Sequence, residues 1–272
     1  MTIKFGAKIN TRPLAEKLSI PQYRLPMILF MFAWPIVWFV FLIYVIGPML
    51  LRADSTVPTW AVILIALLGN GAELGAALII FKREGYRLSF STLRDRINWR
   101  WPKNWKMWAA FVGVFVIAFS FSMLLSPTAD SIAKVSSIPD WMPGHPLKEI
   151  NGLQEGYPDI NFMGNYLFFI IQNFFVVIIF NMFGEELYYR AALQPKMRGV
   201  FGKWDWVASG VGFAMKHLYW WWRVPMLIPA GLGFAFVFGP LGSLPLTILS
   251  HWIGNMEPMM LYFGILALFG LG

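Results

Sequence analysis

The sequence predicts an all-α, polytopic membrane protein: a bundle of about eight transmembrane helices. Apolar residues make up 58% of the 272-residue chain and charged residues 13%, whereas soluble domains average about 45–50% and about 25%. Apolar runs recur at the length of about 20 residues that crosses a bilayer. The composition excludes a soluble globular fold and a disordered chain, and the absence of cysteine excludes disulfides and a thiolate zinc site.

The spans follow in order from the apolar runs. Residues 1–25 are polar and basic and are predicted to form a cytosolic amphipathic tail on the membrane surface. Four clear spans are predicted at 26–51, 58–81, 107–126 and 165–187. Beyond residue 206 the chain is almost continuously apolar and is interrupted by prolines, so three or four further segments fit before its end. The total is seven or eight spans, and eight are favoured. They form one membrane domain over 1–272, with a motif core at about 165–256.

Loop charges predict the orientation. Of the 22 cations, five precede the first span, eight lie between Lys82 and Lys106, and three follow the fourth span, whereas the loop at about 127–164 is acidic. Cytosolic loops of membrane proteins carry the excess of lysine and arginine. We therefore expect a multi-pass protein with a cytosolic N-terminus, and we read the net charge of +8 as membrane topology without nucleic-acid binding.

Two adjacent carboxylates end the fourth span. Glu185 and Glu186 point in different directions because neighbouring residues on an α-helix lie about 100° apart. Glu186 is four residues before Arg190 and is expected to pair with it, whereas Glu185 is expected to remain unpaired and free for chemistry. An interfacial salt bridge without catalytic meaning is the alternative.

Two histidines follow on later apolar segments. His217 ends Phe-Ala-Met-Lys-His, which begins at Phe213, and His251 precedes Asn255 by one helical turn, so that the last two share a face. Ionisable side chains inside a membrane are costly and commonly functional, although a single histidine is often only a helix–helix hydrogen bond. Asn70 and Glu73 form a further polar patch in the second span, for which a structural hydrogen-bonding role is expected.

Three ordered motifs resemble those of the type II CAAX prenyl endopeptidases and the wider CPBP or ABI group of intramembrane proteases. They are Glu185-Glu186 to Arg190, Phe213 to His217, and His251 to Asn255. The resemblance implies a helical bundle with a conical cavity open toward the cytosol and the bilayer. Its implied reaction is hydrolysis of a peptide bond in membrane-associated protein substrates, including removal of the aaX tripeptide from prenylated CAAX C-termini.

The resemblance also implies roles for single residues. Glu185 and His217 would hold and deprotonate the attacking water, while His251 and Asn255 would bind the developing oxyanion. Glu186, Arg190 and Phe213 would support the site.

Two questions stay open at this level. Glu185, His217 and His251 are equally suited to be three ligands of a catalytic Zn²⁺, so the cofactor is either absent or zinc. The alternatives to a protease are a proton-coupled transporter that uses the same groups as a relay, and a non-catalytic immunity or scaffold protein.

Overall fold

The computed structural model describes residues 20–50, 59–138 and 172–255. In the second range the side chains are described from residue 64 onward, and in the third range from residue 178 onward. The described residues are helices joined by turns and short loops, without a strand. The elements in chain order are α2 (Leu25–Phe41), η1 (Leu42–Ile46), α3 (Gly47–Met49), α4 (Thr59–Arg83), α5 (Phe90–Leu93), α6 (Trp105–Val135), η3 (Gln172–Phe183), η4 (Glu186–Leu193), η5 (Gln194–Lys196), α9 (Arg198–Phe201), η6 (Gly202–Trp204), α10 (Asp205–Lys216), η7 (His217–Arg223) and α11 (Val224–Phe238), followed by a helix over 244–255.

Four stretches of described helix are long and apolar enough to cross a membrane: Leu25–Met49, Leu64–Arg83, Trp105–Val135 and Arg198–Phe238. The first three confirm the predicted spans near 26–51, 58–81 and 107–126. The predicted span at 165–187 lies partly outside the described residues, as do the tail up to residue 19 and any span after 255. The count of eight spans therefore stays a prediction.

Helix α6 corrects one predicted boundary. The outer loop was expected to start at residue 127, but α6 continues through Pro127 to Val135. Its 31 residues correspond to about 46 Å of helix, which exceeds the roughly 30 Å hydrocarbon core of a bilayer. The hydroxyl of Ser131 donates to the carbonyl oxygen of Pro127 itself (2.9 Å), one turn earlier in the helix.

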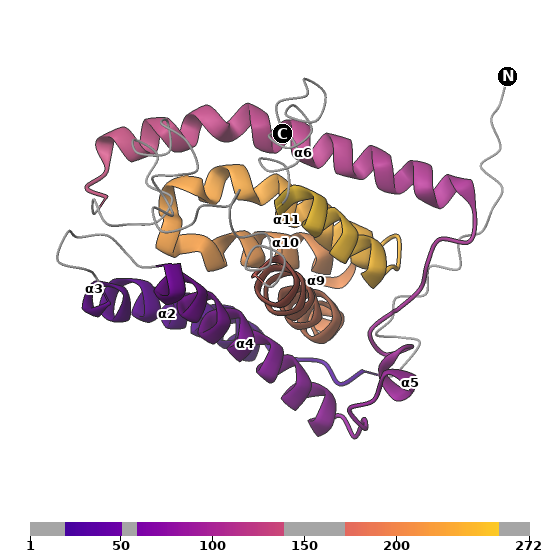
Figure 1. Ribbon diagram of the computed structural model, residues 1–272. Coiled ribbons are helices and arrows are strands. Elements are labelled where there is room, and N and C mark those ends of the chain that lie inside the picture. The colour runs from indigo at the N-terminus through magenta and orange to yellow at the C-terminus, as the bar shows by residue number, and fades with distance from the viewer. Residues whose placement is uncertain (1–19, 51–58, 139–171, 256–272) are drawn as a thin grey trace, which may run out of the picture.

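The helices are arranged around the segment that carries the two carboxylates. Figure 1 shows α6 along one side of the molecule and α2 with α4 along the opposite side, with η3, η4, α10 and α11 between them. The outward faces of α2 and α6 are apolar and exposed, as at Val37 (66%) and Leu124 (72%). Exposed apolar side chains on the outside and polar groups in the interior are what a bundle in lipid requires.

Helices α10 and α11 form a hairpin that brings the second motif into the bundle. The chain leaves helical geometry at Trp220 (φ −120°, ψ 55°), and α11 then returns along α10. Gly210 and Gly231 meet at the crossing: a Cβ added to Gly231 would lie 2.5 Å from the carbonyl oxygen of Gly210. The two backbones touch because neither glycine has a side chain.

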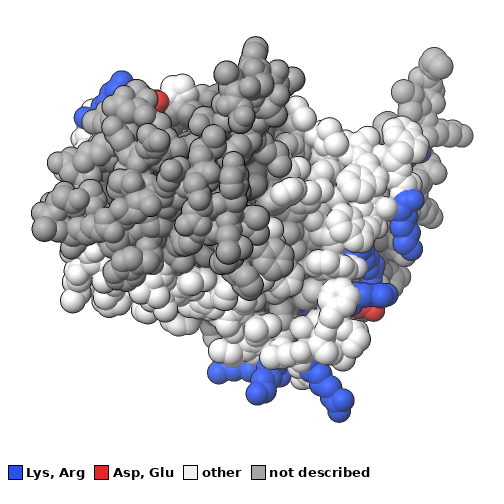
Figure 2. All heavy atoms as spheres, viewed as in Figure 1, with Lys and Arg blue, Asp and Glu red and all other residues white. Residues whose placement is uncertain are grey.

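The basic segments meet at one end of the bundle. Lys196 forms an ion pair with Glu84 (2.7 Å), Gln22 donates to the carbonyl oxygen of Pro195 (3.0 Å), and the backbone of Gly199 donates to Gln22 (2.8 Å). Figure 2 shows Lys and Arg gathered along the lower and right-hand edges of the molecule, with a smaller group at the upper left. The described tail residues and two basic loops thus share one end, as the charge pattern predicted for loops on one side of a membrane.

Candidate active site

The segment that carries Glu185 and Glu186 is wound more widely than an α-helix. Over η3 and η4 the backbone N–H groups bond to the carbonyl five residues earlier, with α-helical geometry only at residues 184–185. The prediction assumed ordinary α-helical turns here. Wide turns of this kind are rare and occur frequently at functional sites.

Glu186 and Arg190 form the predicted ion pair. Arg190 Nε lies 3.2 Å from Glu186 Oε2, and both side chains are fully buried. The guanidinium also donates to the carbonyl oxygen and hydroxyl of Ser209 (3.1 and 3.0 Å), and it lies over the ring of Phe213 at 4.7 Å. Arg190 therefore ties η4 to α10, which is where the second motif begins.

His251 is held by the other oxygen of Glu186. Its Nδ1 lies 2.8 Å from Glu186 Oε1, and because a carboxylate only accepts, Nδ1 is the donor. The ring of Phe234 stacks on the imidazole at 4.8 Å between centroids. The tautomer is thus fixed, and Nε2 of a neutral His251 carries the lone pair.

His217 is oriented in the same manner by the last turn of α10, which precedes it. Nδ1 donates to the carbonyl oxygen of Phe213 (3.2 Å), so that Nε2 of a neutral His217 is again the acceptor. Phe213 separates the two histidines: its ring lies 5.2 Å from that of His217 and 5.7 Å from that of His251. The structure therefore places both histidines against the ring of Phe213.

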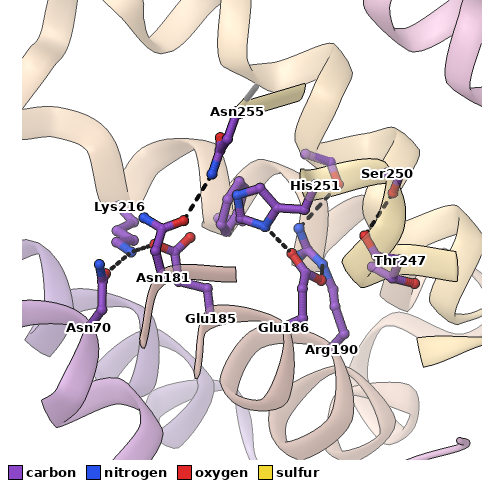
Figure 3. Close-up of polar contacts among 12 residues, drawn as sticks. Asn70, Asn181, Glu185, Glu186, Arg190, Lys216, Thr247, Ser250, His251 and Asn255 are labelled. Carbon is purple, nitrogen blue, oxygen red and sulfur yellow. Dashed lines mark hydrogen bonds and ion pairs between the residues drawn. The ribbon is translucent and has the colours of Figure 1, made fainter. Parts of the chain in front are cut away.

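Glu185 is not the unpaired carboxylate that the sequence predicted. Its Oε1 lies 2.7 Å from Nζ of Lys216, and both side chains are buried. Figure 3 shows Lys216 between Glu185 and Asn70, on the opposite side of the site from Glu186 and Arg190. The prediction was wrong because it considered only neighbours on the same helix.

Lys216 is the site residue that sequence reasoning missed. It also bonds to Glu73 (3.0 Å) and to Asn70 (3.2 Å), the two polar residues of the second span. Those residues were expected to make structural hydrogen bonds, and they do so with a cation beside Glu185. A signal was present, because a lysine and a glutamate inside membrane spans need charged partners and each is a candidate for the other.

Asn255 contacts the segment that precedes Glu185. Its Nδ2 donates to Oδ1 of Asn181 (3.0 Å), which comes from the segment before Glu185 (Figure 3). Asn255 is exposed whereas His251 is buried. The site thus has a buried side, which contains the charged groups, and an exposed amide at its edge.

The three residues proposed as zinc ligands do not form a metal site in the part of the chain that the structure describes. No group of three or more His, Asp or Glu side chains there is placed to hold a metal ion. The Lys216 ammonium lies against Glu185, whereas His217 and His251 are held through Nδ1, which leaves Nε2 of each neutral ring as an acceptor.

The fold and site define a class of protein: an integral membrane helical bundle with two carboxylates, two histidines and an exposed amide gathered inside it. Residues 167–256 match the family described as type II CAAX prenyl endopeptidase Rce1-like, and this match confirms the resemblance carried by the three motifs. All three motifs lie within the matched segment. No curated protein and no solved structure matched the chain.

Proposed function

We propose that the chain is an intramembrane endopeptidase that hydrolyses a peptide bond in membrane-associated protein substrates. The family match supports protease activity of the CAAX type. The observation that carries the proposal is that residues of all three motifs come together. Glu185 and Glu186 are adjacent, Glu186 holds His251, and the rings of His217 and His251 both lie within 6 Å of the Phe213 ring.

The proposed chemistry uses water as the nucleophile. Glu185, assisted by Nε2 of His217, accepts a proton from water as the water oxygen bonds to the scissile carbonyl carbon. The resulting oxyanion accepts hydrogen bonds from His251 and from the amide of Asn255. The C–N bond then breaks, the stored proton passes to the departing amine nitrogen, and the products are a carboxylic acid, which keeps the second proton of the water, and an amine. No metal takes part in this scheme.

The remaining motif residues hold these groups in position. Glu186 accepts a hydrogen bond from Nδ1 of His251, which leaves Nε2 for the oxyanion, and Nε2 donates when the imidazole is protonated. Arg190 keeps Glu186 in place, and Phe213 packs against Arg190 and both histidines. Positioning of this kind contributes to catalysis because the reacting groups are held in productive geometry before the substrate arrives.

The proposed substrates are proteins with a prenylated CAAX C-terminus, from which the aaX tripeptide would be removed. A prenyl chain would anchor the substrate in the bilayer, and the cleaved bond would follow the modified cysteine. We further propose that the site opens toward the cytosol, through a conical cavity in an eight-helix bundle. The basic end of the bundle supports this orientation.

Cleavage of a fluorogenic farnesylated CAAX peptide by purified protein tests the proposal. We expect turnover by the wild type, and loss of turnover with retained folding in Glu185→Ala and His217→Ala. Asp95→Asn is a matched control, because Asp95 is an exposed carboxylate (70%) at 3.6 Å from Arg100. Turnover that survives a chelator supports the metal-free scheme, whereas loss that zinc restores contradicts it. Folded wild-type protein without turnover would contradict the proposed substrate.

A further inference from the structure

Lys216 has a partner for each of its three ammonium hydrogens. Nζ lies 2.7 Å from Glu185 Oε1, 3.0 Å from Glu73 Oε2 and 3.2 Å from Asn70 Oδ1. A lysine has three donors and no acceptor, so this set saturates it. The ring of Phe39 lies under the same ammonium at 4.6 Å from its centroid. The cation is therefore fixed from several directions.

Glu73 is fixed as firmly as the lysine. Its Oε2 accepts from Lys216, and its Oε1 accepts from the hydroxyl of Tyr189 at 2.8 Å. Both side chains of the Glu73–Lys216 pair are almost fully buried, with 0% and 1% exposed. Glu73 and Asn70 belong to α4, outside the matched family segment. They hold the ammonium of Lys216, which in turn contacts Glu185.

The charges around Lys216 indicate why the site needs it. Without the lysine, Glu185 and Glu73 would be two buried carboxylates with no cation between them, and a buried charge without a partner is strongly unfavourable. The other charged or titratable side chains on the elements that surround this pair are Lys82 and Arg83 from α4, Glu186, Tyr188, Tyr189 and Arg190 from η4, Asp205 from α10, His217, Tyr219 and Arg223 from η7, and His251 from the last described helix. Arg190 is engaged by Glu186. Lys216 is the cation that contacts Glu185.

We propose that Lys216 is the positioning residue of this site: it fixes Glu185 against Glu73 and Asn70 of the second span, so that the carboxylate is correctly oriented toward the water. This inference rests on the proposed function. Lys216 acts through Glu185 and does not bind the substrate, because its side chain is only 1% exposed. The site therefore includes α4, although none of the three motifs lies in that helix.

A substitution series at Lys216 tests the proposal in the full-length protein. Lys216→Met keeps the length of the stem and removes the charge, so we expect kcat to fall by about 100-fold or more, as for loss of a working general base. KM should stay within about twofold, because a buried residue has no substrate contact to lose. Lys216→Arg keeps the charge, and we expect it to recover part of kcat.

Lys196→Met is the matched control. Lys196 is also a buried lysine (3% exposed) and is paired at 2.7 Å with a carboxylate, Glu84, at the basic end of the bundle. We expect this variant to lower thermal stability and to leave kcat of the folded protein unchanged. A wild-type kcat in Lys216→Met, or a loss no larger than that of Lys196→Met, would overturn the positioning role.

Thermal unfolding separates this inference from the proposed function. Lys216→Met and Glu185→Gln should each lower the melting temperature, and the double variant should fall by less than the sum, because each single change leaves the other partner unpaired. Additive shifts in the melting temperature would overturn the inference, whether or not the wild-type protein cleaves the peptide. If the wild type cleaves nothing and the shifts are coupled, the protease proposal fails while the pairing of Lys216 with Glu185 is supported.

Discussion

Nδ1 of His251 donates to Oε1 of Glu186 at 2.8 Å, while Oε2 of the same carboxylate accepts from Arg190 at 3.2 Å. One glutamate thus orients a histidine and neutralises an arginine. The contact connects the first motif to the third across 65 positions of sequence. Glu186 therefore has a second partner besides Arg190, and the spacing of the first motif did not predict it.

Glu186→Gln should destabilise the protein. The substitution leaves the fully buried Arg190 without an anion, and removing one partner of a buried pair costs about 3–5 kcal/mol. Thermal unfolding in detergent measures the loss. Asp95→Asn, which removes an exposed pair, should change stability by about 1 kcal/mol or less. Equal melting temperatures for the two variants would contradict the bracing role.

Asn255→Ala should lower turnover more than apparent substrate affinity. Loss of one oxyanion donor typically reduces kcat by about 10²–10³-fold. Asn181→Ala is the control, because it removes the acceptor of the 3.0 Å bond but leaves the Asn255 amide in place. Kinetics with the farnesylated peptide would test this, and an effect confined to KM would count against an oxyanion role.

Stability should decrease at acid pH because of Glu84. Burial acts to raise the pKa of this carboxyl, but hydrogen bonds and charges from Arg96 and Lys196 outweigh burial and lower the pKa below its ordinary value. The stabilisation is present above the pKa of an unfolded glutamate, about 4.3, and is lost as the pH falls through the lower pKa of the folded state.

Melting temperatures recorded from neutral to acid pH check this behaviour. Glu84→Gln should be less stable than the wild type at neutral pH, and the difference should narrow toward acid. A constant difference at every pH would contradict the assignment.

Gly231→Ala should disturb the α10–α11 hairpin. Its new methyl group would lie 2.5 Å from the carbonyl oxygen of Gly210, a backbone atom that cannot rotate away, and overpacking of this kind costs about 1–3 kcal/mol. Gly113→Ala is the matched control, since a Cβ there meets nothing within 4 Å and alanine favours a helix. A melting temperature that falls in Gly231→Ala and holds in Gly113→Ala would support the close contact.

Local spacing explains what could be predicted about the site. The Glu186–Arg190 pair follows from a separation of four residues, and it survives the wider turns of η4. Contacts between distant segments were not accessible in this way. Lys216 and Glu73 are 143 positions apart, and no periodicity in the sequence relates them.

The fold, like the site, was predictable where a local pattern in the sequence determines it. Hydropathy placed the first three spans because a bilayer sets their length. It did not predict that α6 passes through Pro127, since a proline marks a probable boundary and does not by itself end a membrane helix. The wide turns of η3 and η4 have no hydropathy signature, because hydropathy reports residue polarity and not the number of residues per turn.

The separation between Glu73 and Lys216 has a consequence for biogenesis. The second span leaves the ribosome long before Lys216 is made, and at about 5–20 residues per second the delay over 143 positions is roughly 7–30 seconds. During that time Glu73 has no ammonium to meet, and an acidic side chain at the centre of a helix costs about 2.5–3.5 kcal/mol on insertion. The ion pair between the second span and α10 can therefore form only after Lys216 has been made, so this contact belongs to a late step of assembly.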